Sequence, residues 1–121
     1  MTEIKNTKQY DLEERTFQFA KNCRNFIKKL QKIISNIEYS KQLARSSGSQ
    51  AANYIEANES LSKKDFVMRA KICRKESKES RLWLNLCDIN GDKELEKEQN
   101  IFIKESTELM NIFGAIIRKS E

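Results

Sequence analysis

The chain has 121 residues, a formal net charge of +5, three glycines, and neither proline nor histidine. An all-β chain needs many turns built from glycine and proline, so this composition favours one all-α domain. Without histidine, the chain cannot build a Ser–His or Cys–His nucleophile or a Glu-x-x-His di-iron site. It also has no Gly-rich phosphate loop, and we therefore expect no enzyme activity and no cofactor.

The first helix is expected over about residues 12–34. Residues 1–10 are polar and are predicted to form a flexible N-terminal segment, with Asp11 as the N-cap of the helix. Apolar positions then recur at steps of four and three, which is typical of one buried helix face. The helix carries no glycine or proline stop signal. We place a turn near residues 35–36, because Ser35 and Glu38 can form a capping box; one continuous helix over residues 11–57 is the alternative.

Three further helices follow in chain order. The second is predicted over residues 36–57, the third over 63–88 with Ser62 as N-cap, and the fourth over 93–119 with Asp92 as N-cap. Residues 88–92 have the composition of a turn. Four helices joined by short turns predict an antiparallel up-down-up-down four-helix bundle formed by residues 11–121.

The cysteines and the lengths of the apolar runs indicate the cellular compartment of the protein. Cys23, Cys73 and Cys87 fall on apolar helix faces, so we expect reduced, buried thiols rather than disulfides or a zinc site. The apolar runs are far shorter than a membrane span, and residues 1–5 lack the apolar stretch of a signal peptide. These features predict a cytoplasmic protein that does not enter a membrane.

The second helix combines small residues with polar residues on one face. The polar residues recur at steps of four, four and three: Arg45, Ser49, Asn53 and Glu56. We expect them to form a buried or interfacial hydrogen-bonding network with Glu76 and Glu79 of the third helix, because a buried polar group must be paired. A magnesium site made by the glutamates of this set is the weaker alternative.

These segments carry a family resemblance. The spaced polar residues of helix two, the segments 53–57, 62–66 and 71–80, and the Trp83-Leu84 pair resemble the bacterial four helix bundle proteins related to the 23S ribosomal RNA intervening-sequence proteins. The likeness is specific over residues 42–86. It departs from the family at Ala51, where members often have proline, and at residues 57–58, where many have glycine.

The resemblance implies a homopentamer around a central channel and no catalytic residues. A related member is an accessory factor to the reverse transcriptase of diversity-generating retroelements and is thought to bind nucleic acid through a basic surface. By resemblance, RNA, DNA or a reverse-transcriptase-like protein is therefore an expected partner.

The charge layout agrees with a nucleic-acid partner. Residues 1–35 and 60–87 carry most of the positive charge, whereas residues 88–121 are acidic. Two sets of cations follow helical spacing and are the predicted nucleic-acid contacts: Lys71, Arg74, Lys78 and Arg81 on helix three, and Lys21, Arg24, Lys28 and Lys32 on helix one. The alternatives are that both sets only solubilise exposed faces, or that the protein is a scaffold whose acidic fourth helix docks another protein.

Overall fold

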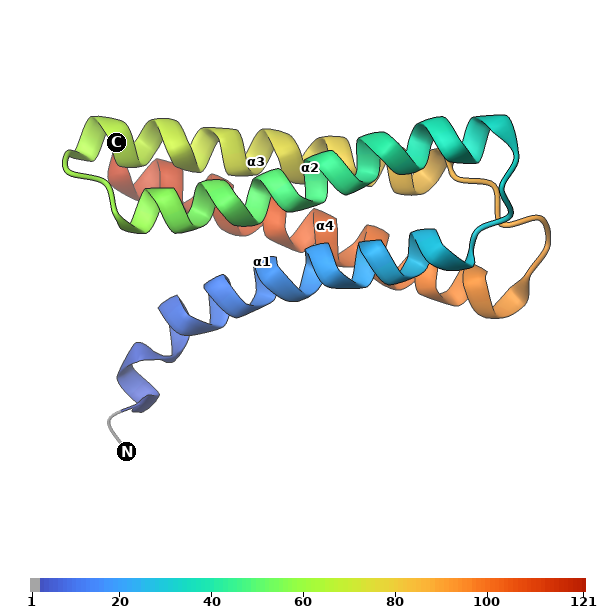
Figure 1. Ribbon diagram of the computed structural model, residues 1–121. Helices are drawn as coiled ribbons and strands as arrows, with labels where there is room; N and C mark the ends of the chain where they lie inside the picture. Colours follow the sequence, from blue (N-terminus) through green and yellow to red (C-terminus); the bar gives the residue numbers. More distant parts are fainter. Residues whose placement is uncertain (1–2) are drawn as a thin grey trace.

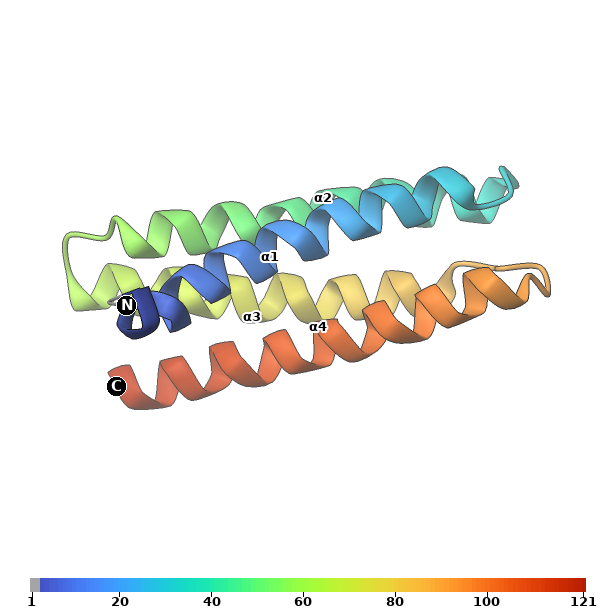
Figure 2. The ribbon, with the colours of Figure 1, turned by 90° about the horizontal axis from the view of Figure 1, so that it is seen from below.

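A computed structural model describes the backbone of residues 3–121 and the side chains from residue 12 onward. This part of the chain forms four α-helices and no strand: α1 (Glu3–Lys29), α2 (Ile34–Asn58), α3 (Lys63–Leu86) and α4 (Lys93–Ser120). The helices alternate in direction (Figure 1), and α1 packs against α2 and α4 while α3 packs against α2 and α4. A view from below shows the same four-helix arrangement (Figure 2). The predicted all-α up-down-up-down bundle is confirmed.

The start of α1 differs from the prediction. The helix begins at Glu3, so Asp11 lies inside it and is not its N-cap. Residues 1–10 were predicted to be flexible, but the helix includes all of them from Glu3 onward. Residues 1–2 lie outside the described part of the chain. The flexibility of residues 1–10 stays a prediction. Figure 1 shows the N-terminal part of α1 turning away from α2.

The connection between α1 and α2 also differs. It comprises residues 30–33, so the turn predicted at residues 35–36 is wrong, and the single long helix is excluded. No side chain caps α2, whose N-cap is Ile33. The position of the turn depends on buried Asn36 instead, which donates to the carbonyl oxygens of Gln31 (3.0 Å) and Asp88 (2.9 Å). Its side-chain oxygen accepts a hydrogen bond from the Asp88 N–H at 2.8 Å.

The other two helix starts agree with the prediction. The Asp65 N–H donates to Ser62 Oγ and the Leu95 N–H donates to Asp92 Oδ1, both at 3.1 Å, so Ser62 and Asp92 are the N-caps of α3 and α4. The turn before α4 contains Asn90 and Gly91 with φ of 52° and 77°, a backbone region that these two residue types tolerate best.

The core consists of side chains at the predicted apolar positions, among them Phe19, Phe26, Leu84 and Phe113. No helix within residues 3–121 has enough apolar length to cross a membrane. Polar contacts supplement the packing between α1 and α4. Arg15 donates to Glu105 at 2.6 and 3.0 Å and to Glu108 at 3.0 Å, and Lys29 pairs with Glu98 at 2.7 Å. These contacts help to hold α1 on the bundle.

The three cysteines are free and buried, as predicted. Burial raises the pKa of the Cys73 thiol to about 12 and that of Cys87 to about 11, and it also raises the pKa of Cys23. Because the thiolate is the reactive form, the native thiols are protected both by burial and by protonation.

We expect the thiols to react with a disulfide reagent at pH 8 at least about 100-fold more slowly in the folded protein than in urea. Since the unfolded thiols lose their protons first, the free energy of unfolding should also fall as pH rises from about 9 toward 11. Thiol titration with and without urea measures the first effect, and urea unfolding at several pH values measures the second. A thiol that reacts equally fast in both states would contradict the expectation.

Candidate functional site

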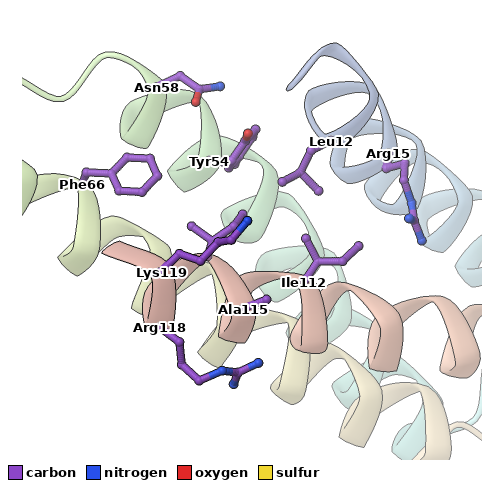
Figure 3. A pocket seen from close by; sticks show the side chains of 10 residues that line it. Leu12, Arg15, Tyr54, Asn58, Phe66, Ile112, Ala115, Arg118 and Lys119 are labelled. Atoms are coloured by element: carbon purple, nitrogen blue, oxygen red, sulfur yellow. The ribbon is translucent and has the colours of Figure 1, made fainter. Parts of the chain in front are cut away.

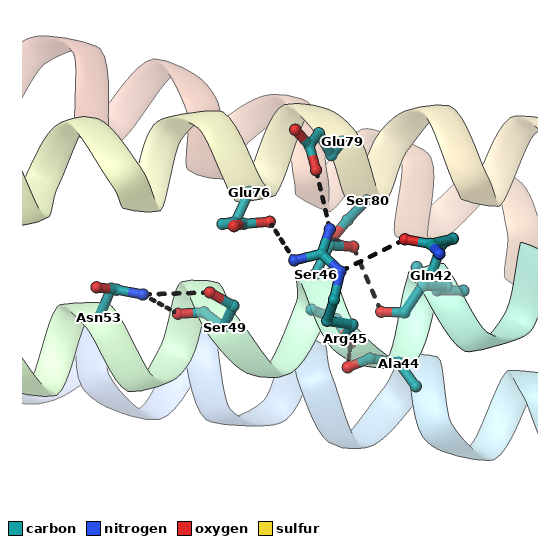
Figure 4. Close-up of polar contacts among 11 residues, drawn as sticks. Gln42, Ala44, Arg45, Ser46, Ser49, Asn53, Glu76, Glu79 and Ser80 are labelled. Atoms are coloured by element: carbon teal, nitrogen blue, oxygen red, sulfur yellow. Dashed lines mark hydrogen bonds and ion pairs between the residues drawn. The ribbon is translucent and has the colours of Figure 1, made fainter.

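The polar face predicted on α2 meets α3 where the two helices pack together (Figure 4). Arg45 donates to Glu76 Oε1 at 3.5 Å through Nη1 and to Glu79 Oε1 at 3.1 Å through Nη2. Its guanidinium therefore lies between two carboxylates of successive turns of α3. The Glu76 side chain is only 7% exposed, whereas Arg45 is half exposed. The arrangement places a buried negative charge under a cation that is open to solvent.

The predicted network continues along the contact between α2 and α3, with one residue added and one left out. Asn53 donates to the carbonyl oxygen of Ser49 at 3.0 Å and to its Oγ at 3.2 Å, and it accepts a hydrogen bond from Arg69 at 2.9 Å. The sequence reasoning missed Arg69, although it lies two helical turns before Glu76 and so on the same face of α3. Glu56 is exposed, and within residues 12–121 its carboxylate makes no hydrogen bond or ion pair. The structure therefore does not bring Glu56 into the network.

A second set of polar contacts, which is buried, was also missed. Ser46 and Ser80 share a buried hydrogen bond of 2.7 Å, and Gln50 donates to the carbonyl oxygen of Thr16 at 2.8 Å. Small hydroxyl side chains let α2 and α3 approach closely, but Gln50 Oε1 and Ser77 Oγ are buried without a hydrogen-bond partner among residues 12–121. Among the side chains that the structure describes, no group of three or more Cys, Asp or Glu residues is placed to hold a metal ion.

Three of the four cations predicted on α3 lie beside α4 or beside Glu121, which follows it. Lys71 pairs with Glu121 at 3.3 Å, and Arg81 donates to Thr107 at 3.2 Å. Arg74 and Arg118 both border Gly114: a Cβ there would be 3.4 Å from Arg118 Nη1 and 4.0 Å from Arg74 Cδ. We call this surface the α3–α4 basic face, comprising Lys71, Arg74, Lys78, Arg81 and Arg118. Its α4 member, Arg118, was missed because the fourth helix is acidic as a whole.

Three acidic residues of α4 face α1 and not α3. Glu98, Glu105 and Glu108 pair with Lys29 and Arg15 of α1. They therefore do not oppose the α3–α4 basic face, and they are already engaged within the chain. Because these three glutamates pair within the chain, α4 has less acidic surface with which to dock another protein.

The basic residues of α1 are exposed but form a shorter stripe than predicted. Lys21, Arg24 and Lys28 lie on α1, and Lys21 Nζ is 5.9 Å from the centre of the Phe17 ring. Lys32 lies in the connection after α1, because the helix ends at Lys29. Its assignment to a helical stripe was therefore wrong.

An apolar groove of about 950 Å³ lies at the end of the bundle where α1 turns away. Leu12, Tyr54 and Ile112 point into it, whereas Arg118 points away (Figure 3). Burial raises the pKa of the Tyr54 hydroxyl, which therefore stays protonated at neutral pH. The groove is lined mainly by apolar side chains, and it shares no residue with the polar network between α2 and α3.

Comparisons with known proteins agree with this architecture. Residues 8–115 match the model of a family described as "23S rRNA-intervening sequence protein". A crystal structure from Bacteroides thetaiotaomicron VPI-5482, of a protein described as having unknown function and as part of the S23 ribosomal protein family, is 28% identical, with a TM-score of 0.73. The match covers 87% of this chain and 96% of that chain. No curated protein matches the chain.

Proposed function

This chain belongs to the 23S rRNA-intervening sequence protein family, and we propose that it is a non-enzymatic, homo-oligomeric module that binds RNA or DNA through the α3–α4 basic face. The resemblance noted in the sequence supports a homopentamer that acts in the cytoplasm, alone or beside a nucleic-acid-handling protein such as a reverse transcriptase. The single observation that carries the nucleic-acid part is the gathering of cations from two helices on one face.

The chemistry of that face suits a phosphate backbone. Lys71 to Arg81 span about 15 Å at ~1.5 Å per residue, and Arg118 adds a cation from α4. Only Lys71 of this set is in an ion pair within residues 12–121, so the other four cations keep their charge available. Most aromatic side chains of residues 12–121 lie in the core or pack against it, which does not suit base stacking. The contacts should therefore be to phosphates, with strong salt dependence and weak sequence preference.

Charge reversal on this face tests the proposal. Arg74→Glu with Lys78→Glu should weaken binding of fluorescent single-stranded RNA and duplex DNA at least about 10-fold at low salt. For duplex DNA, the plot of log K against log salt concentration should also become shallower, with a slope smaller in magnitude by about 1.8, because two phosphate contacts are lost. Fluorescence anisotropy over a salt series measures both quantities.

A matched control carries the same change in net charge elsewhere. Lys93→Glu with Lys97→Glu alters the exposed start of α4 and should leave binding nearly unchanged. Equal losses in both double variants would show that net charge, and not this face, governs binding. If the unaltered protein bound neither nucleic acid even at low salt, the proposal would be wrong and the scaffold alternative would replace it.

The same assay compares the two predicted basic surfaces. Arg24→Glu with Lys28→Glu changes the stripe on α1. A smaller loss than in the α3 double variant would agree with the α3–α4 basic face as the main contact. A larger loss of binding would indicate that the basic residues of α1 are the main contact.

A further inference from the structure

Two rows of residues without an acidic side chain meet where α3 packs on α4. Figure 2 shows these two helices side by side along their length. The α3 row consists of the four predicted cations, and the α4 row, at steps of four, three and four residues, consists of Thr107, Asn111, Gly114 and Arg118. The rows meet at Arg81, which donates to Thr107, and at Arg74, which borders Gly114. We call these two rows together the α3–α4 seam.

Two arginine side chains from different helices converge in the middle of the seam. Arg118 Nη1 and Arg74 Cδ lie 3.4 Å and 4.0 Å from the point that a Cβ on Gly114 would occupy. Both arginines are exposed, and neither makes a hydrogen bond or an ion pair with another residue of 12–121. Neighbouring guanidinium groups repel each other unless an anion lies between them. A phosphate group suits this place, because its oxygens accept hydrogen bonds from the fixed fork of donors on each guanidinium.

An open cavity of about 770 Å³ continues the seam where α3 begins and α4 ends. Val67 and Met68 give the cavity an apolar side, and three lysines, Lys71 among them, give it positive charge. Met68 is 47% exposed, so its thioether is available to a ligand. It lies six residues before Arg74, which is about 9 Å along the helix axis at ~1.5 Å per residue. The cavity is within the size range of small-ligand sites and lies next to the arginine pair.

The arginine pair and the cavity together suit one nucleotide of a single strand. Methionine sulfur makes favourable contacts with aromatic rings, so the apolar side of the cavity suits the flat face of a base. In a duplex the base is stacked and paired, and it reaches such a cavity only at the cost of being extruded. The seam therefore discriminates between strand types by a base contact that a stacked duplex does not offer.

We propose that the α3–α4 seam binds single-stranded RNA or DNA in a fixed register, with one phosphate between Arg74 and Arg118 over Gly114 and an adjoining base against Val67 and Met68. The inference rests on the proposed nucleic-acid binding, and it names the strand type and the central contact. The remaining cations of the α3–α4 basic face contact the neighbouring phosphates. Since apolar contact with the face of a base is open to all four bases, the preference for sequence stays weak.

Fluorescence anisotropy with a labelled single strand tests the arginine pair. Arg118→Gln should weaken binding at least about 5-fold and reduce the magnitude of the salt slope by about 0.7, because one phosphate contact is lost. Lys119→Gln is the matched control: it removes the same charge from the next residue, which lines the apolar groove at the end of the bundle, and should change affinity less than about 2-fold.

A change of Gly114 tests the geometry of the pair without a change of charge. The side chain of Gly114→Leu takes the place of the two arginine side chains and should weaken binding as much as Arg118→Gln does. Gly114→Ala should have a smaller effect, because a Cβ at 3.4 Å from Arg118 Nη1 makes an ordinary contact. Circular dichroism should show a folded bundle in both variants, since the nearest atoms belong to flexible side chains.

An abasic strand and a duplex of the same length test the base contact. The unaltered protein should bind the intact single strand at least about 3-fold more tightly than either of them at the same salt concentration. Met68→Ser should remove the advantage of the intact strand over the abasic strand. Ile101→Ser is the control, because Ile101 is 60% exposed on α4, and it should leave that advantage unchanged.

The outcomes separate this inference from the proposed function. An unaltered protein that bound no nucleic acid at low salt would overturn both. A loss for Arg118→Gln no larger than that for Lys119→Gln would overturn the arginine pair alone. Equal binding of the intact and abasic strands, or tighter binding of the duplex, would overturn the base contact and the single-strand assignment. Displacement of the strand by adenosine monophosphate at the same nucleotide concentration would overturn a strand as the source of the nucleotide.

Discussion

Replacing Arg45 with alanine should lower the free energy of unfolding by about 2–3 kcal/mol. Glu76 is 7% exposed, and among residues 12–121 Arg45 supplies its only ion pair. Without the guanidinium, a carboxylate stays buried with no opposite charge, and the cost of removing it from water is no longer offset. Urea unfolding at one fixed protein concentration measures the change, since contacts between copies contribute to apparent stability.

A second change separates the charge from the packing. Glu76→Gln introduced together with Arg45→Ala should recover a large part of the lost stability, because a neutral amide is easier to bury than a carboxylate. Lys41→Ala is the control: its pair with Glu38 is exposed at 3.4 Å, so the effect should stay within about 0.5 kcal/mol. If Arg45→Ala costs no more than Lys41→Ala, the buried carboxylate is not held by Arg45 and the explanation fails.

Asn36→Ala should destabilise the fold at least as much as Arg45→Ala does. We expect the free energy of unfolding to fall by about 2–4 kcal/mol and the Tm by about 10 °C. The side chain makes two hydrogen bonds as a donor and one as an acceptor, which join the α1–α2 connection to Asp88 after α3. Alanine removes all three hydrogen bonds and leaves the backbone groups of Gln31 and Asp88 without these partners. Calorimetry gives the Tm, and hydrogen exchange at Asp88 reports directly on the lost bond.

The neighbouring Ser35 provides the control for this position. Ser35→Ala should change stability by less than about 0.5 kcal/mol, because Ser35 is exposed and does not cap α2. A larger loss for Ser35→Ala than for Asn36→Ala would show that a local cap, and not the contact with Asp88, determines where α2 begins.

Local chemistry explains which parts of the fold could be predicted. Ser62 and Asp92 cap helices through N–H groups three residues away, so the signal lies within one turn of chain. The connection at residues 30–33 was misplaced because Asn36 is satisfied by Asp88, far away in the sequence. The start of α1 was misplaced because polar residues before Leu12 resemble a frayed end, although their backbone continues the helix.

The same distinction applies to the polar network between α2 and α3. Helical spacing placed Arg45, Glu76 and Glu79 on facing sides of two helices, and the structure joins them. Spacing alone could not exclude Glu56, because a position at the edge of a helix face is either covered or exposed according to how the neighbouring helix crosses it. It could not supply Arg69 for Asn53 either, since that bond depends on the register between α2 and α3.

The amino-acid pattern by itself determined the all-α class, the number of helices, their buried faces and the family, because these depend on periodicity and on residues close in the chain. Only the tertiary structure decided how the charges are distributed. It turned Glu98, Glu105 and Glu108 of α4 toward Lys29 and Arg15, and it brought Arg118 beside Arg74 across Gly114. Ion pairs between helices depend on packing angle and register, which no single helix encodes.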